Sequence, residues 1–311
     1  MSDFAHYEER HKGLLQVRGF SPRTLEIYSH YLKRFFRYLE DVGVTQVVEV
    51  RPDHVRDYLM QAVEQATEKG HSHLASVQMN HLSAVKSFFR LLQAEGFLVA
   101  DPARHIPYPK QPQRLPRSIL TANEMKKLLE TPDTGTAIGY RDRAMMEVFY
   151  STALRVSELE NLKIEEVDLR DGFVRVNSGK GDKDRVVPLG SVACRYVESY
   201  LKGVRPMLMR GQGHSFLFVS QYGNKMSKGL ARRQIREYTA KAGLTKTVSP
   251  HTFRHTCATL MMKNRANLRH LQEMLGHSKL ETTQVYASVS IRDLKEAHKK
   301  YHPRERERGI V

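Results

Sequence analysis

From the middle of the chain onward, six side chains are of the types needed to hold a phosphodiester and to break it. In chain order they are Arg155, Lys180, His251, Arg254, His277 and Tyr286. A guanidinium group presents forked N–H donors, so the two arginines can grip the non-bridging oxygens of a phosphate. The phenol of Tyr286 can act as an oxygen nucleophile that forms a covalent intermediate. The set therefore predicts that a tyrosine attacks a phosphodiester.

The spacing of His251 and Arg254 places both on one face of a predicted helix, because side chains three residues apart are neighbours on a helical surface. Ser249 is a typical N-cap residue, and Pro250 is favoured at the first helical position. The positive end of the helix dipole then lies beside the pair, where it favours a phosphate.

A proton donor is also needed, since cleavage of a phosphodiester expels an alkoxide, which is a far stronger base than the anion of a phenol of pKa about 10. Lys180 lies on a turn flanked by Gly179 and Gly181, which suits a general acid on a mobile loop. Lys183 and Arg185 are nearby alternatives, and a solvated turn is the other interpretation of this lysine.

The sequence predicts no metal site and no cofactor. His251 and His255 have a spacing that can bind zinc, but the segment lacks the glutamate of an H-E-x-x-H motif, so a packing or hydrogen-bonding role is expected for His255. No acidic cluster and no phosphate-binding G-x-x-x-x-G-K-[ST] loop occurs in the sequence. A phosphotyrosine bond conserves the energy of the broken phosphodiester, so the chemistry requires neither ATP nor Mg²⁺.

Five stretches together resemble the tyrosine recombinase (phage-integrase-like) family, and within it the Xer-type site-specific recombinases. They are the L-R-V-S-E-L segment Leu154–Leu159, the G-K-G-x-K-x-R-x-V-P-L hairpin Gly179–Leu189, the H-x-x-R pair His251 and Arg254, the L-G-H-S segment Leu275–Ser278, and the T-T-Q-x-Y segment Thr282–Tyr286. Each stretch is a weak signal alone, whereas all five in order are specific. The resemblance covers roughly residues 5 to 303.

The resemblance implies an enzyme that cuts and rejoins DNA strands through a 3′-phosphotyrosine intermediate, for DNA integration, excision or dimer resolution. It implies that all six side chains above are catalytic, with Tyr286 as the nucleophile, and it selects Lys180 as the general acid. Glu158 is implied as a supporting carboxylate that orients His251 or an arginine. The implied partners are double-stranded DNA and further copies of the chain, in a homo-tetramer on two paired sites.

Two alternatives come from other functional classes. A type IB topoisomerase shares the tyrosine chemistry but acts as a monomer at one site, and an assembly surface near the C-terminus argues against it. A catalytically silent DNA-binding protein would not need all six chemical positions, which are filled here. Between chromosomal dimer resolution and a mobile-element integrase the sequence leaves the choice open.

Charge and composition favour a polyanionic partner. The chain of 311 residues has a net charge of +16. Residues 1–110 hold 14 Lys and Arg against 13 Asp and Glu, whereas residues 111–311 hold 36 against 21. The electrostatic attraction of phosphate groups is therefore expected to come mainly from the second part. Two cysteines are too few for a disulfide framework. Without a membrane-length apolar run or a signal-peptide pattern, a cytoplasmic, nucleoid-associated protein with no membrane partner is expected.

Residues 1–106 are expected to form a helical N-terminal domain, which the resemblance implies is a DNA-binding domain of the core-binding (SAM-like) type. Its four helices end before Gly19, Gly43, Gly70 and Gly96. Basic residues stand beside the apolar stripes of two of these helices: Lys33, Arg34, Arg37, Lys86 and Arg90. They form either a solvated face or a DNA-contacting face, and the resemblance favours the second.

A proline-rich linker at 107–117 and a catalytic domain at 118–311 are expected to follow. The predicted catalytic domain is mixed α/β, mostly helical, with a small antiparallel sheet from Phe173–Val176, Arg185–Leu189 and Phe216–Val219. The fold class is therefore mainly α. A last helix at 291–301 has an apolar stripe of Ile291, Leu294, Ala297 and Tyr301. By resemblance it is an assembly helix that docks into a neighbouring protomer, and the alternative is packing on its own domain.

Overall fold

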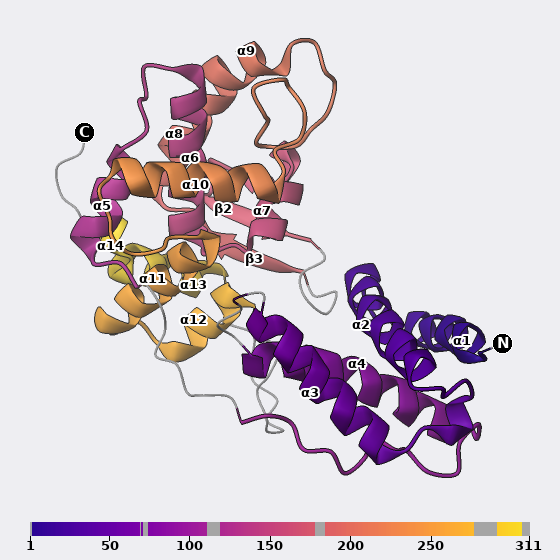
Figure 1. The fold of residues 1–311 in the computed structure, drawn as a ribbon. Helices are drawn as coiled ribbons and strands as arrows, with labels where there is room; N and C mark the ends of the chain where they lie inside the picture. Colours follow the sequence, from indigo (N-terminus) through magenta and orange to yellow (C-terminus); the bar gives the residue numbers. More distant parts are fainter. Residues whose placement is uncertain are drawn as a thin grey trace. The chain divides into compact units, whose positions relative to one another are not determined.

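The computed structural model describes residues 2–68, 70, 74–110, 119–177, 184–276 and 291–306 (Figure 1). The chain divides into two compact units, Met1–Arg114 and Leu115–Val311. Among the described helices, none is both long and apolar enough to cross a membrane. Most of the predicted linker at 107–117 lies outside the described residues, so its exact extent stays a prediction.

The N-terminal unit consists of four helices with a short 3-10 turn between the second and the third. The helices are α1 (Phe4–Val17), α2 (Pro22–Asp41), α3 (Pro52–Glu68) and α4 (Leu74–Ala94). The start of α2 follows from its sequence, because Ser21 Oγ accepts the N–H of Thr24 at 3.2 Å and Pro22 occupies the first turn. The predicted helical bundle is confirmed.

Helix α4 contacts each of the other three helices and supplies the centre of this unit's core. Its Phe88 and Phe89 are fully buried, and the ring of Phe88 meets that of Phe36 edge-on at 5.1 Å. Phe36 in turn stacks on Phe4 of α1 with ring centroids 4.9 Å apart. Aromatic side chains bury large areas, so this cluster forms a substantial part of the unit's hydrophobic core.

The C-terminal unit is mostly helical and is built around α6 (Figure 1). Its helices before the site are α5 (Ala122–Glu130), α6 (Ala137–Thr152), α7 (Val156–Asn161), α8 (Ser191–Ser199), α9 (Arg205–Met209) and α10 (Lys228–Lys241). Those that follow are α11 (Pro250–Lys263), α12 (Leu268–Leu275), α13 (Ile291–Tyr301) and α14 (Pro303–Arg306). Almost every side chain of α6 from Arg141 onward is buried, as expected for a central helix.

The described part of this unit contains one three-stranded antiparallel sheet in the order β1 (Val167–Asp168), β2 (Phe173–Val176) and β3 (Arg185–Pro188). Val174 pairs with Val187, and Val176 pairs with Arg185. This confirms the predicted fold class, a helical N-terminal bundle followed by a mostly helical unit with a small sheet.

The third strand was predicted at the wrong place. Phe216–Val219 forms isolated bridges rather than a strand of this sheet. The remaining strand of the sheet is β1, which pairs with β2. Leu217, Phe218 and Val219 are apolar because they fill the core. Their backbone N–H groups make individual hydrogen bonds outside a strand ladder. The N–H of Leu217 donates to Leu162 O at 2.7 Å, and the N–H of Val219 donates to Tyr200 Oη at 3.3 Å.

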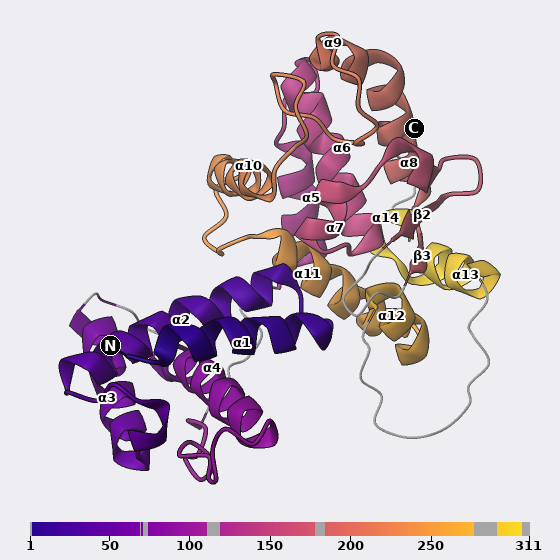
Figure 2. The same cartoon turned by 90° about the vertical axis from the view of Figure 1, so that its right-hand side faces the viewer.

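The C-terminal segment packs on its own chain, where α13 lies beside β3 (Figure 1 and Figure 2). The Nε2 atoms of His298 and His302 lie 2.8 Å and 3.0 Å from the carbonyl oxygens of Ser151 and Tyr150, at the end of α6. Arg304 donates to the buried Glu147 at 3.0 Å. Of the predicted stripe, Leu294 and Ala297 are buried in this arrangement, and docking into a neighbouring protomer stays a prediction.

Candidate active site

Arg155 enters the site from a sharp turn between two helices. Helix α6 ends at Thr152, and Ala153 has a φ of 52°, a left-handed conformation that residues with side chains seldom adopt. The turn places Arg155 at the N-cap of α7, with its side chain 23 % exposed. The strained residue therefore lies two positions before a candidate catalytic arginine, which is where such conformations concentrate.

Glu158 is the carboxylate that holds Arg155 in place. Its Oε1 accepts from Arg155 Nη1 at 2.8 Å, and its Oε2 accepts from the backbone N–H of Arg155 at 2.8 Å. Burial disfavours its ionised form, but hydrogen bonds from Arg185 and from both groups of Arg155 outweigh burial and lower the pKa of Glu158 to about 2. The carboxylate is thus ionised at neutral pH and orients an arginine, one of the two roles implied for it.

Arg254 is the buried arginine of the site and stands on the first turns of α11. Its Nη1 donates to the carbonyl of Ala153 at 2.8 Å, and its Nη2 donates to the carbonyl of Leu275 at 2.5 Å. Burial, followed by the charge of Arg155, lowers the pKa of Arg254 to about 10. The side chain therefore remains charged at neutral pH although only 8 % of it is exposed.

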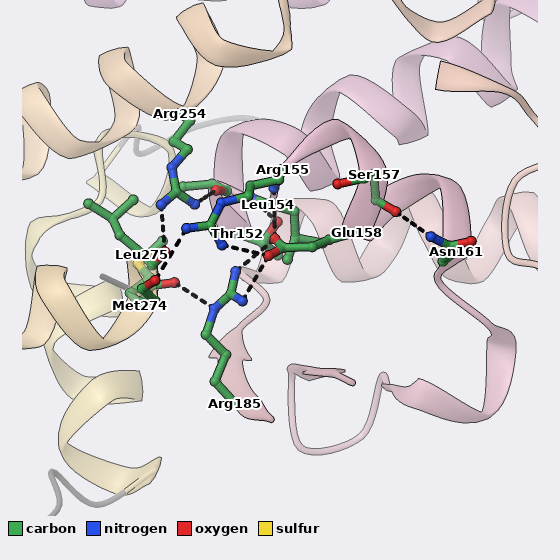
Figure 3. Close-up of polar contacts among 12 residues, drawn as sticks. Thr152, Leu154, Arg155, Ser157, Glu158, Asn161, Arg185, Arg254, Met274 and Leu275 are labelled. Atoms are coloured by element: carbon green, nitrogen blue, oxygen red, sulfur yellow. Dashed lines mark hydrogen bonds and ion pairs between the residues drawn. The ribbon is translucent and has the colours of Figure 1, made fainter. Parts of the chain in front are cut away.

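Three arginines meet at the end of α12 (Figure 3). Arg185 donates from Nε to Met274 O at 3.2 Å, Arg254 donates to Leu275 O, and Arg155 donates from Nη2 to Gly276 O at 3.2 Å. The last carbonyls of a helix lack partners within it and carry the negative end of its dipole, so they attract cations. Consecutive carbonyls thereby fix Arg155 and Arg254 side by side.

Gly276 is required at this point for two reasons. Its φ of 61° is left-handed, which ends α12 and which glycine adopts without strain. A Cβ atom there would also lie 3.1 Å from the side chain of Arg185. The glycine of the L-G-H-S segment therefore allows Arg185 to approach the backbone at the end of α12.

His251 lies in the first turn of α11, three residues before Arg254. Its side chain is exposed at the surface. Desolvation of part of the ring, followed by the charges of His255, Arg254, Arg232 and Arg155, still lowers its pKa below the usual value of 6.5. The ring is therefore neutral at pH 7, with one nitrogen able to accept a proton. Of the two roles expected for His255, packing or hydrogen bonding, packing is wrong, because His255 is exposed on the same helix.

Three of the predicted catalytic residues, Lys180, His277 and Tyr286, lie outside the described residues. Among those described, Arg155, Glu158 and Arg254 are brought together by the bonds above, and His251 interacts electrostatically with both arginines. No group of three or more His, Cys, Asp or Glu in the described part could hold a metal ion.

The sequence interpretation missed Arg185 as a partner of Glu158. It had named this arginine only as an alternative proton donor in the hairpin. The bidentate contact with Glu158 joins residues that are 27 positions apart, and no spacing rule indicates such a pair. The only signal was the arginine of the hairpin pattern itself.

The basic residues of the N-terminal unit do not all share one environment. Lys33, Arg37 and Arg90 are exposed, and Arg34 is partly buried with its Nη2 donating to Gln65 at 2.9 Å. Lys86 is not on an exposed face as the sequence suggested. Its Nζ donates to Arg104 O at 3.2 Å and lies 4.9 Å from the centre of the Tyr108 ring, because residues 104–108 cover it.

Two family descriptions and a group of curated relatives match this chain. The Phage integrase family matches residues 118–292, and the Phage integrase, N-terminal SAM-like domain matches residues 9–96. "Tyrosine recombinase XerD" of Staphylococcus epidermidis is 36 % identical over 297 residues, which is 95 % of this chain and 98 % of the relative.

Solved structures with the same fold include DNA complexes. A lambda integrase(75-356) dimer bound to a COC' core site has a TM-score of 0.66 at 20 % identity, over 91 % of this chain and 99 % of that one. A lambda integrase tetramer bound to a Holliday junction has a TM-score of 0.65 at 21 % identity, over 91 % and 80 % of the two chains. The family matches, and the 36 % sequence identity to a relative over nearly the whole length, lead to one conclusion. The chain belongs to the phage integrase family and is a site-specific recombinase of the tyrosine type.

Proposed function

We propose that this recombinase holds the scissile phosphate of DNA with Arg155 and Arg254 and attacks it with Tyr286. The observation that carries the proposal is the parallel anchoring of the two arginines on the consecutive carbonyls of Leu275 and Gly276. A guanidinium group has five N–H donors. Each of the two uses two of them on the protein, so three remain on each without a partner among the described residues.

In the proposed step the phenolic oxygen of Tyr286 attacks phosphorus, and the bond between phosphorus and the 5′ oxygen breaks. The phenolic proton passes to His251, whose lowered pKa keeps one ring nitrogen unprotonated at pH 7. Lys180 gives a proton to the departing 5′ oxygen. The freed 5′-hydroxyl of the paired duplex then attacks the 3′-phosphotyrosine and releases the phenol. The charges of Arg155 and Arg254 stabilise the extra negative charge of the transition state.

The proposed chemistry needs no cofactor, because the phosphotyrosine ester keeps the energy of the phosphodiester for the rejoining step. The proposed chemistry also sets the partners. The substrate is double-stranded DNA, which the exposed Lys33, Arg37 and Arg90 contact through its backbone. The assembly is a homo-tetramer on two paired sites, supported by the tetramer that lambda integrase forms on a Holliday junction with the same fold. Acting on chromosomal DNA, the protein would be found in the cytoplasm with the nucleoid.

The test is covalent trapping on DNA. A double-stranded site is selected from a random pool by binding to the protein, and a nicked version of it lets the cleaved fragment diffuse away. The wild-type chain should then form an adduct that survives a denaturing gel, and Tyr286→Phe should bind the same site without an adduct. Tyr222→Phe is the matched control, since Tyr222 is 60 % exposed and outside the proposed site, and it should trap DNA normally.

An adduct in Tyr286→Phe would mean that another side chain is the nucleophile. Failure of the wild-type chain to trap any selected site would contradict the proposed function as a whole.

A further inference from the structure

Arg185 lies at the start of β3, where its side chain can link neighbouring elements of the C-terminal unit. It is the first residue of β3 and pairs with Val176 of β2. Its side chain is only 11 % exposed although arginine is normally a surface residue. A nearly buried cation must be paired, so its partners show what it does.

The guanidinium group of Arg185 makes contacts in two directions at once. Its Nη1 and Nη2 donate to Oε1 and Oε2 of Glu158 at 3.0 Å and 2.8 Å, a bidentate arrangement. Its Nε donates to the carbonyl of Met274 in α12. Arg185 therefore ties together two elements, α7 and α12, that are far apart in the sequence (Figure 3). A lysine ammonium is a compact charge and cannot reproduce this fork.

Both elements that Arg185 joins also carry a contact of Arg155. Glu158 accepts from Arg155, and Gly276, two residues after Met274, accepts from it as well. Arg155 is thus held at two points, and Arg185 bonds beside each of them. Any movement of Glu158 away from the end of α12 would pull the guanidinium of Arg155 off one of its two anchors.

Arg185 is poorly suited to the alternative role of proton donor. Arginine side chains are in general poor proton donors, and both Nη atoms of Arg185 are engaged with the carboxylate of Glu158. Three of its five N–H groups are directed at protein acceptors. A positioning role agrees with this geometry, and general acid catalysis does not.

We propose that Arg185 is a positioning residue for strand cleavage: it locks Glu158 to the end of α12 and so holds Arg155 at the angle needed to grip the phosphate. The proposal rests on the function proposed above. It predicts a loss in the rate of the cleavage step with little loss in DNA binding. A shift of about 1 Å in a catalytic group can cost on the order of a hundredfold in rate, so a fall of tenfold to a hundredfold is expected from Arg185→Gln.

The experiment measures single-turnover cleavage at saturating protein with two nicked substrates, one ordinary and one with sulfur as the 5′-bridging atom. A thiolate leaves without a proton, so the sulfur substrate rescues a variant that has lost its acid. Arg185→Gln should be slow on both substrates, and Arg185→Lys should recover only part of the rate. Arg170→Gln removes the same charge from an exposed residue at the other end of the sheet, and it should cleave within about twofold of wild type.

The second measurement is a double-mutant cycle with Glu158→Gln. If Arg185 acts through Glu158, the double variant should be no slower than the slower single variant. If the fold loss in cleavage rate of the double variant equals the product of the two single losses, the proposal is overturned. It is also overturned if Arg185→Gln cleaves at the wild-type rate, or if the sulfur substrate restores the rate of Arg185→Gln. Should Arg185→Gln lose its cooperative thermal transition, Arg185→Lys takes its place in the cycle. A wild-type chain that cleaves neither substrate would contradict the proposed function rather than this role of Arg185.

Discussion

Arg254 combines burial, charge and two main-chain contacts in one side chain. Two N–H groups hold the carbonyls of Ala153 and Leu275, and the remaining N–H groups can face a phosphate. Lysine keeps the charge but cannot bond both carbonyls and a phosphate oxygen in one plane. We expect Arg254→Lys to slow strand cleavage on the order of a hundredfold, the size of a lost transition-state donor. Single-turnover trapping on DNA measures the loss.

A binding measurement separates this loss from a general failure of the protein. The affinity of Arg254→Lys for the intact site should remain within a few fold of wild type, since many other phosphate contacts contribute to affinity. Cleavage by Arg254→Lys at the wild-type rate would show that the fork of Arg254 is not used in the reaction.

The pH dependence of cleavage should report His251. Its folded pKa is lowered below 6.5, so the neutral base form persists at pH 6.5 and is lost only as the pH falls through that lower value. We therefore expect the cleavage rate to stay flat from pH 7.5 down to about 6.5 and to fall below it. The acid limb should disappear in His251→Gln, whose residual rate is low throughout. If the cleavage rate of His251→Gln still falls at the same low pH as that of wild type, the titrating group is not His251.

How far the site could be predicted differs from residue to residue. Arg155 and Arg254 could be paired from the sequence because each belongs to a stretch that resembles the family. The contacts of Arg185 could not, because a main-chain carbonyl such as Met274 O is present at every position and leaves no mark in the sequence. The burial of Lys86 was missed for a similar reason, since it depends on where the segment 104–108 crosses α4.

At the level of elements, helix starts were the part best predicted from sequence. Ser249 stands at the N-cap where the sequence placed it. Ser21 and Thr121 are N-caps as well, and their side chains accept the N–H of the residue three positions on, a local interaction. The strand at Phe216–Val219 was wrong because an apolar run shows burial and not the partner of its backbone. Strand β1 has only two residues, too few for any periodicity.

The packing of the C-terminal segment on α6 can be tested with one added methyl group. Gly190 has φ −67°, which alanine adopts freely, but a Cβ there would lie 2.4 Å from Glu305 Oε1 and 2.9 Å from the His298 ring. Gly190→Ala should therefore displace α13 and α14 and lower the stability of their docking by about 1–3 kcal/mol. Amide hydrogen exchange of residues 291–306 measures the effect.

Gly203→Ala is the control for this substitution, because a Cβ at Gly203 meets nothing within 4 Å. It should leave the exchange of residues 291–306 unchanged. Equal protection of that segment in Gly190→Ala and wild type would show that the segment is not held against Gly190 in solution.

For the whole molecule, the uneven charge sets how DNA binding responds to salt. Each phosphate contact releases counterions and adds about −0.9 to the slope of log K against log salt. The exposed Arg37 and Arg90 lie in the nearly neutral N-terminal part. If each contacts one phosphate, the variant Arg37→Gln/Arg90→Gln should bind with a slope reduced by about 1.8. Filter binding at several salt concentrations gives both slopes.

An unchanged slope in the double variant would remove these two arginines from the DNA contact. A flat salt dependence of the wild-type chain would contradict backbone binding by the strongly basic residues 111–311 as well.

The acceptors for three arginines at the end of α12 are main-chain carbonyls, and this has a consequence for mutational tolerance. A substitution at Met274 or Leu275 cannot delete a carbonyl, so any apolar side chain of similar volume should keep these two arginine contacts. Gly276 has less freedom, because its left-handed backbone disfavours a side chain and a Cβ atom there would lie 3.1 Å from Arg185. In a saturation library selected for recombination, we expect drift at 274 and 275 and a strong preference for glycine at 276. The contacts of Arg185 and Arg254 with α12 thus depend on main-chain atoms that every residue carries, so they should survive changes of the side chains at 274 and 275.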